Sequence, residues 1–507
     1  MKWGGRVARR MSDFGPVPDD TAPSWWSRHG ESVSGLAISC VAHATLLLAL
    51  ALILLPATKL QETFFVTTLQ PMDHARQDDP AQMEIMPEQL KDGTVDVAPQ
   101  QIDALRISDT PSPVSIDFND DRVELERDLR EILGPGAERG SEYAGRSAAA
   151  RAALVKAFGG TSESEAAVSN GLKWLAAHQQ GDGSWNFNHI KAACGGECPH
   201  PGDLSPCTIA ATSLALLCYL GAGHTHQEGS YQEEVGGGLE YLIDQIKPEE
   251  YGSNLRDPGN AGMYSQGLAT IVLCEAYGVS GDRLLRRPAQ FAINYVQNAQ
   301  HPRQGGWRYE FRTPDSPGDT SVAGWQIMAL TSGKIARLKV SRQSIRLAAT
   351  FLDSVSLEDG AFYGYTTPAK RHSTTAVGLL CRMYLGWNRN HPGIRKGVNY
   401  LGTIGPLRHD MYYNYYATQV MHHWGGDEWT KWNAVMREQL VQTQERKGHA
   451  AGSWSPLNSD GSPRDPHGTA RGGRLYATCF AILTLEVYYR HLPLYQRQAV
   501  ETDLRVE

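Results

Sequence analysis

A repeat with a period of about fifty residues, a length typical of stacked supersecondary units, runs through residues 164–494. Each copy has a first helix, a turn rich in glycine and aromatic residues, and a second, more apolar helix. The six second helices are expected at 205–223, 263–278, 318–333, 372–387, 413–426 and 473–492. Strand signals are weak throughout, and the sequence therefore predicts an all-α fold of six helical hairpins.

The second helices indicate how the hairpins assemble. The stretch CTIAATSLALLCYLG, for example, has small residues on one side and leucines on the other, which favours burial of both faces. Six such hairpins can close into an α/α toroid, with the second helices as the inner barrel and the first helices as the outer one. The inner helices then run parallel, and we expect their N-termini to surround the mouth of a cavity.

A different kind of segment precedes the repeats. Residues 36–55, LAISCVAHATLLLALALILL, are long enough to cross the hydrocarbon core of a bilayer, about 30 Å thick. Basic residues gather before this segment and only Lys59 follows soon after it, which predicts a cytoplasmic tail over 1–32. We predict a single transmembrane anchor at 33–57 in the inner membrane, with the later domain on the periplasmic side. A cleaved signal peptide is the alternative.

Two polar residues of this anchor share one face, because Ser39 and His43 are four positions apart. An ionisable residue inside a membrane span is a candidate functional residue. The Ser-x-x-x-His pattern resembles the anchor of TonB-type energy-transducing proteins, which implies a proton-motive-force motor as a partner. The alternative is a histidine tolerated near the membrane interface.

Charge and composition define the remaining segments. The formal net charge is −7, and residues 72–139 alone carry 17 acidic and 7 basic side chains. We predict an acidic flexible linker at 58–146, the toroid at 147–495 and a tail at 496–507. The chain has no basic footprint, so nucleic acid is not expected as a partner.

The turns QGDGSW, QGGWRYEF and GHAAGSW resemble the Gln/Gly/Trp repeats of squalene and other terpenoid cyclases, which also occur in protein prenyltransferase β-subunits. Both families are α/α toroids, so the resemblance implies the same fold. It covers about two-thirds of the chain. The glycines permit tight turns, and we expect Trp185, Trp307 and Trp454 to pack between outer helices.

Asp319 is the first candidate catalytic residue, at the start of the third inner helix. Squalene–hopene-type cyclases place an Asp-x-Asp-Asp-Thr motif there, and its middle aspartate protonates the substrate. This chain reads Ser316-Pro317-Gly318-Asp319-Thr320, so only the last aspartate remains. Asp319 is therefore either an N-cap or an acid, and the pattern favours the cap.

His372 is the second candidate, because protein prenyltransferases hold zinc with a histidine at an inner-helix start. The Asp-x-Cys pair that this resemblance requires is missing. We therefore assign no metal ligands and expect no cofactor. Cys194, Cys198 and Cys207 gather in one polar loop with His189 and His200, where a disulfide, a metal site and free thiols all remain open.

The ligand-binding candidates are aromatic and basic residues near the expected rim. Aromatic walls suit polyprenyl chains, whereas arginines and helix N-termini suit an anionic head group. The predicted ligand-binding residues are Trp325, Tyr412, Tyr415, Tyr416, Tyr476, Arg371 and Arg474. Two functions remain: a membrane-anchored protein that binds or modifies an isoprenoid lipid, by cyclisation or otherwise, and a non-catalytic scaffold on a TonB-like anchor.

Overall fold

The computed structural model describes residues 143–191, 194–313, 315–466 and 469–494. The predicted anchor at 33–57, with Ser39 and His43, lies outside the described residues, as do nearly all of the linker and the tail. None of the helices in the described ranges has the length and apolar character that a membrane crossing requires.

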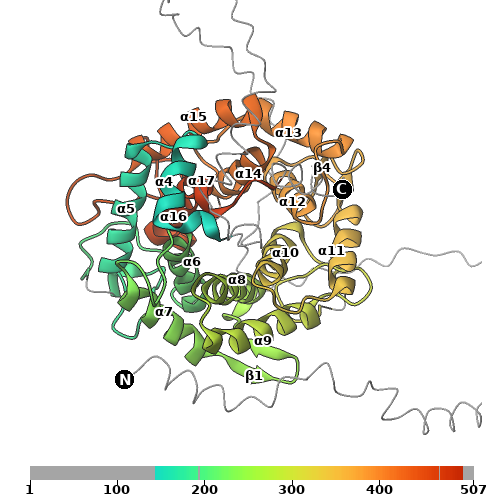
Figure 1. Ribbon diagram of the computed structural model, residues 1–507, viewed down its shortest axis with the longest axis horizontal. Coiled ribbons are helices and arrows are strands. Elements are labelled where there is room, and N and C mark those ends of the chain that lie inside the picture. Colours follow the sequence, from blue (N-terminus) through green and yellow to red (C-terminus); the bar gives the residue numbers. More distant parts are fainter. Residues whose placement is uncertain (1–142, 192–193, 314, 467–468, 495–507) are drawn as a thin grey trace, which may run out of the picture. The chain divides into compact units, whose positions relative to one another are not determined.

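The described part is mainly helical, and its helices alternate between two concentric layers (Figure 1). The inner helices are α6 (Thr208–Gly221), α8 (Gly262–Ser280), α10 (Thr320–Ile335), α12 (His372–Tyr384), α14 (Met411–Trp424) and α16 (Thr469–Leu485). The outer helices are α5 (Ser162–Ala177), α7 (Gln232–Gln245), α9 (Arg283–Ala299), α11 (Arg342–Ser354), α13 (Pro392–Ile404) and α15 (Gly426–Thr443).

Contacts between neighbouring inner helices close the ring. Helix α6 packs on α8, each later inner helix packs on the next, and α16 returns to pack on α6. The six predicted hairpins and their order are therefore confirmed. Helix α6 is buried on all sides after its first residue, which explains its continuous apolar sequence, whereas α9 alternates buried and exposed positions.

The remaining elements are short. Helix α4 (Ala148–Ala157) follows the 3-10 turn η2 (Ala144–Arg146), and α17 (Val487–Arg490) follows α16. The other 3-10 turns are η3 (His189–Lys191) and η4 (Gly259–Ala261). The expectation of an all-α chain needs one correction, because two antiparallel strand pairs occur between helices: β1 (Lys247–Glu249) with β2 (Gly252–Asn254), and β3 (Ser356–Leu357) with β4 (Phe362–Tyr363).

The three tryptophans of the turn motifs are buried, and the rings of Trp185 and Trp454 lie against the next outer helix, at Gly238 of α7 and Gly171 of α5, as the expected packing between outer helices requires. Each indole Nε1 donates to a carbonyl of the preceding outer helix at 2.8 Å: Trp185 to Leu175, Trp307 to Val296, and Trp454 to Leu440. These hydrogen bonds satisfy helix carbonyls near the C-terminus while the ring fills the space between the layers.

A glutamine tethers each of these turns to the next outer helix, and in the first two turns it is not the glutamine that directly precedes a glycine in the sequence. Each side-chain Nε2 donates to a glycine carbonyl of its own turn and to an early carbonyl of the next outer helix. The three residues are Gln179, Gln300 and Gln444. The partner of Gln444 is Ala167 of α5, so this contact joins the last hairpin to the first.

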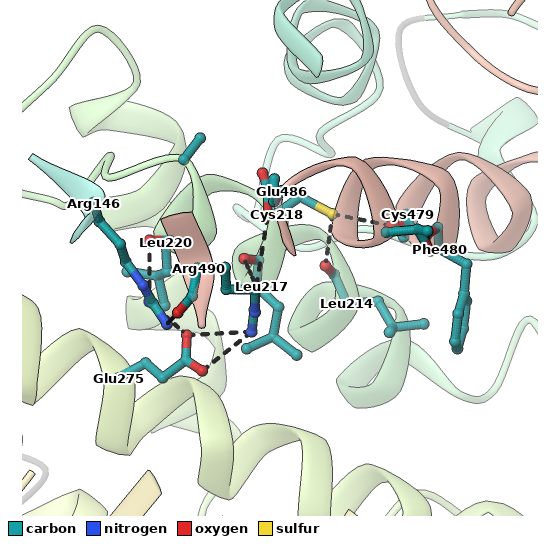
Figure 2. A network of polar contacts seen from close by, with 12 residues as sticks. Arg146, Leu214, Leu217, Cys218, Leu220, Glu275, Cys479, Phe480, Glu486 and Arg490 are labelled. Atoms are coloured by element: carbon teal, nitrogen blue, oxygen red, sulfur yellow. Dashed lines mark hydrogen bonds and ion pairs between the residues drawn. The ribbon is translucent and has the colours of Figure 1, made fainter. Parts of the chain in front are cut away.

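A network of buried charged side chains lies at the C-terminal ends of the inner helices (Figure 2). Glu275 of α8 lies 2.8 Å from Arg146 and 3.1 Å from Arg490. The same two arginines donate to the carbonyls of Leu220 and Leu217 in α6. Cations at a helix C-terminus are favoured by the helix dipole. The network connects η2, α6, α8 and α17 at this end of the barrel.

Candidate functional site

A cavity of about 120 Å³ lies at the opposite end of the barrel, where the inner helices begin. All six inner helices contribute to its wall near their N-termini. One wall residue from each is Leu214, Tyr264, Trp325, Thr374, Tyr412 and Tyr476, in chain order. Among the described residues that line it, none is a carboxylate, an amine or a guanidinium.

The five predicted aromatic residues separate into two groups. Trp325, Tyr412 and Tyr476 line the cavity. Tyr415 is only 1% exposed and packs behind the wall, with its ring centroid 5.9 Å from that of Trp325. Tyr416 is likewise buried, edge-on to Trp325 at 5.7 Å. These two tyrosines thus support the wall, although the sequence placed them on its surface.

Asp319 caps helix α10. Its Oδ1 accepts hydrogen bonds from Val322 N at 2.9 Å and Ser321 Oγ at 2.6 Å, and its Oδ2 lies 2.8 Å from Arg308 Nη1. The side chain is 0% exposed and does not line the cavity. Burial raises the pKa of Asp319, and the bonds from Ser321, Val322 and Arg308 oppose that rise.

A hydrogen-bonded chain connects Asp319 to the cavity wall. Ser321 Oγ, which donates to Asp319, lies 2.8 Å from the hydroxyl of Tyr264. On the other side, Arg308 donates to the hydroxyl of Tyr365, at 2.5 Å. Both tyrosines line the cavity. Asp319 therefore orients the polar groups of the wall without contacting the enclosed space itself.

His372, the second candidate, stands at the first position of α12 and is partly exposed. Its Nε2 lies 3.1 Å from Asp410 Oδ2, which also accepts from Ser373 Oγ at 2.7 Å. Asp410 in turn caps α14 through Tyr413 N. His372 does not line the cavity, and its contact with Asp410 joins the start of α12 to the start of α14.

Neither predicted arginine reaches the cavity. Arg371 is exposed at the N-cap position of α12 and makes no capping hydrogen bond. Arg474 is buried, and its guanidinium donates to the carbonyl of Pro199 at 2.9 Å and to Ser453 Oγ at 2.9 Å. The anionic head-group site that these arginines suggested is therefore not formed at the cavity by them.

The aspartates beneath the rim include three that the sequence did not single out: Asp257, Asp410 and Asp465, all buried. Asp257 accepts from Ile209 N and Ala210 N, and Asp465 accepts from Tyr412 N. Burial raises the pKa of Asp257 to about 6, although the amides of α6 oppose this. Asp257, Asp410 and Asp465 each precede an apolar helix in the sequence, but Asp257 and Asp465 accept from the first turns of helices about fifty residues earlier in the chain.

The three loop cysteines form no disulfide with one another and lie in two different places. Cys207 lines the cavity, and burial raises the pKa of its thiol to about 12, so it serves as an uncharged wall residue. Cys194 and Cys198 lie together, with the N–H of Cys198 3.3 Å from the sulfur of Cys194.

No protein-family model matches the sequence, and no curated protein matches it. Among solved structures, an inactive variant of an α-1,6-mannanase from Salegentibacter sp. HEL1_6 with mannotriose has a TM-score of 0.45 and 9% identity over 64% of this chain and 99% of its own. Cellobiose 2-epimerase from Bacillus thermoamylovorans B4167 has a TM-score of 0.46 and 13% identity, with 64% and 98% coverage. The type II terpene cyclase MstE from Scytonema, with geranylgeranyl dihydroxybenzoate, has a TM-score of 0.41 and 15% identity, with 65% and 97% coverage.

Proposed function

We propose that the toroid binds an apolar ligand of the isoprenoid class in the cavity at the N-terminal rim of its inner helices. The observation that carries this proposal is the wall itself, which joins aliphatic residues to the aromatic rings of Trp325, Tyr412 and Tyr476 and holds no charged side chain among its described residues. Apolar walls with a few hydroxyl groups are typical of sites for hydrophobic small molecules.

The volume limits what the cavity encloses. About 120 Å³ is close to the ~150 Å³ of an engineered apolar cavity that holds benzene. One five-carbon isoprene unit fits this space, and its burial contributes about 4 kcal/mol at about 0.8 kcal/mol per carbon. That energy alone corresponds to millimolar affinity. A longer chain, with its end in the cavity and its remainder against the rim, therefore suits the site better.

Binding without turnover is the proposed mode. Alkene protonation requires an acid whose proton reaches the enclosed substrate. Both Asp319 oxygens are engaged by other donors, and the carboxylates beneath the rim cap helices. Glycoside hydrolysis would require a pair of carboxylates flanking the bond, and the described wall residues provide none. An active cyclase remains the alternative that the test below addresses.

The predicted anchor completes the proposal. A single span at 33–57 would hold the toroid beside a bilayer, from which it would take its ligand. The motor partner predicted through Ser39 and His43 belongs to this hypothesis, and a non-catalytic scaffold on a TonB-like anchor is its alternative.

Product analysis separates these functions. The full chain in detergent is incubated with farnesol, squalene or mannotriose, and bound and released molecules are identified by mass spectrometry. The proposal predicts retention of an unchanged isoprenoid and no retention of the sugar. A cyclised product would establish the cyclase alternative, and retention of the sugar alone would overturn the proposal.

A further inference from the structure

Four potential metal ligands converge where the first and last hairpins of the ring meet. They are His178 at the end of α5, Cys194 and Cys198 in the loop between α5 and α6, and His449 in the loop between α15 and α16. One sulfur or nitrogen atom from each of the four lies within 4.8 Å of the other three.

The separations suit one small ion at the centre of the cluster. Cys198 Sγ lies 3.4 Å from His178 Nε2 and 3.1 Å from His449 Nδ1, and Cys194 Sγ lies 3.6 Å from His449 Nδ1. Zinc bonds of about 2.3 Å to sulfur and about 2.0–2.1 Å to nitrogen place such atoms about 3.6 Å apart in a tetrahedron. These three separations are therefore close to those of a tetrahedral site, and the other three are within 4.8 Å.

The surroundings of the cluster orient its ligands. His178 Nδ1 lies 2.6 Å from the carbonyl oxygen of Trp174, which can only accept, so Nδ1 carries the hydrogen. Nε2 then presents its lone pair to the cluster, the arrangement that metal-bound histidines generally have. The indole of Trp174 also stacks on this imidazole at 3.9 Å, which fixes the plane of the ring.

We infer that His178, Cys194, Cys198 and His449 form a structural zinc site that joins the first hairpin of the toroid to the last. Two thiolates and two imidazoles in a tetrahedral arrangement are ligands that Zn²⁺ prefers. Four protein ligands leave no position for a substrate, which is characteristic of a structural site. His449 is exposed and provides the route by which the ion enters.

The site would help to hold the first and last hairpins together, in addition to the packing of α16 on α6. Cys194 and His449 are 255 positions apart, so one ion would connect the two ends of the repeat domain. Because the four ligands come together only in the folded chain, the binding free energy of the ion would add to the stability of the fold. In the sequence, Phe187 and Leu204 flank the loop segment that carries Cys194 and Cys198, and both flanking residues line the cavity. A bound ion would therefore restrict the motion of this part of the cavity wall.

The test measures zinc in the purified full chain by plasma mass spectrometry and repeats the measurement after exchange for Co²⁺. We expect about one zinc per chain, and tetrahedral visible bands with a thiolate-to-cobalt band after exchange. Cys198→Ser and His449→Gln should each lose most of the bound zinc and lower the melting temperature. His449→Gln changes an exposed residue, so it keeps the test valid if Cys198→Ser does not fold.

Two neighbouring residues provide matched controls. Cys207→Ser removes a thiol of the same loop outside the cluster, and His189→Gln removes an imidazole whose ring centroid lies 5.7 Å from that of His178. Both should keep their zinc. Equal loss of zinc in the controls, no stoichiometric zinc in the wild type, or a Cys194–Cys198 disulfide in place of the metal would each overturn the inference. None of these results depends on whether the cavity binds an isoprenoid.

Discussion

Arg308 Nη1 lies 2.8 Å from Asp319 Oδ2, so the carboxylate that caps helix α10 is also one half of a buried ion pair. Truncating a simple N-cap residue to alanine lowers the free energy of unfolding by about 1 kcal/mol. Removing one partner of a buried ion pair lowers it by about 3–5 kcal/mol. Since the Arg308 side chain is 23% exposed, the penalty for Asp319 should lie between these values.

We therefore expect Asp319→Ala to lower the free energy of unfolding by about 3 kcal/mol, and Asp319→Asn by about half as much because the amide oxygen still accepts from Val322. Urea denaturation measures both. Ser341→Ala is the matched control, because Ser341 caps outer helix α11 through Ser344 N without an ion pair. If Asp319→Ala costs no more than Ser341→Ala, the pair with Arg308 contributes nothing.

The aromatic wall yields a second prediction. The ring of Tyr415 packs against Trp325 and Phe480. Tyr415→Ala should therefore lower the free energy of unfolding by about 3–5 kcal/mol, as truncation of a core ring does. Tyr476 faces the cavity and is not fully enclosed, so Tyr476→Ala should cost no more than about 2 kcal/mol. Isoprenoid affinity should fall with Tyr476→Ala. Equal stability losses for the two variants would show that Tyr476 belongs to the core.

The buried charged residues at the C-terminal ends of the inner helices permit a matched pair of substitutions. Burial raises the pKa of Glu275, but the charges of Arg146 and Arg490 outweigh that effect and hold it below its usual value. Burial raises the pKa of Glu486 well above its usual value, which favours the neutral form of this carboxyl, although the charges of Arg490 and Arg146 oppose the rise. Glu275→Gln should cost about 3–5 kcal/mol, and Glu486→Gln less than about 1 kcal/mol because it replaces one neutral group with another.

Thermal unfolding at pH 7 compares these two variants. Equal destabilisation would mean that Glu486 is also ionised in the folded chain.

A fourth prediction concerns acid pH. Burial lowers the pKa of His422 from 6.5 to about 4, while its Nε2 donates to the carbonyl of His491 at 2.9 Å. The unfolded chain therefore binds a proton between pH 6.5 and pH 4 that the folded chain does not. Stability falls as the pH decreases through this window, by about 3 kcal/mol for this residue.

His422→Phe removes this titration and should flatten the dependence of unfolding free energy on pH, even though its stability at pH 7 is lower. An unchanged slope would assign the acid sensitivity to other groups, such as the neighbouring His491, whose pKa is also lowered by burial.

The hairpins could be predicted from sequence because the information is local. An apolar run after a Gly-rich turn specifies an inner helix, and the predicted 205–223 contains the observed α6 (Thr208–Gly221). Asp319 could be predicted as a cap for the same reason, since the amide that it accepts from is three residues away.

Relationships between hairpins could not be predicted in the same way. Tyr415 and Tyr412 lie on the same helix, and only the contacts of α14 with other hairpins, such as those of Tyr415 with Trp325 of α10 and Phe480 of α16, determine that one supports the wall and the other forms it. His449 joins the cysteine cluster only because the ring brings the last hairpin beside the first. Gln179 and Gln444 likewise contact outer helices that follow them in space.

Photoaffinity labelling tests the central proposal most directly. A diazirine analogue of farnesol should label peptides of α8, α10 and α16 that carry Tyr264, Trp325 and Tyr476, and excess farnesol should prevent it. Ala210→Phe, which fills the cavity from α6, should abolish the labelling, whereas Val435→Phe, at a site 53% exposed on α15, should not. Labelling of outer helices that farnesol does not prevent and Ala210→Phe does not reduce would contradict an isoprenoid site in this cavity.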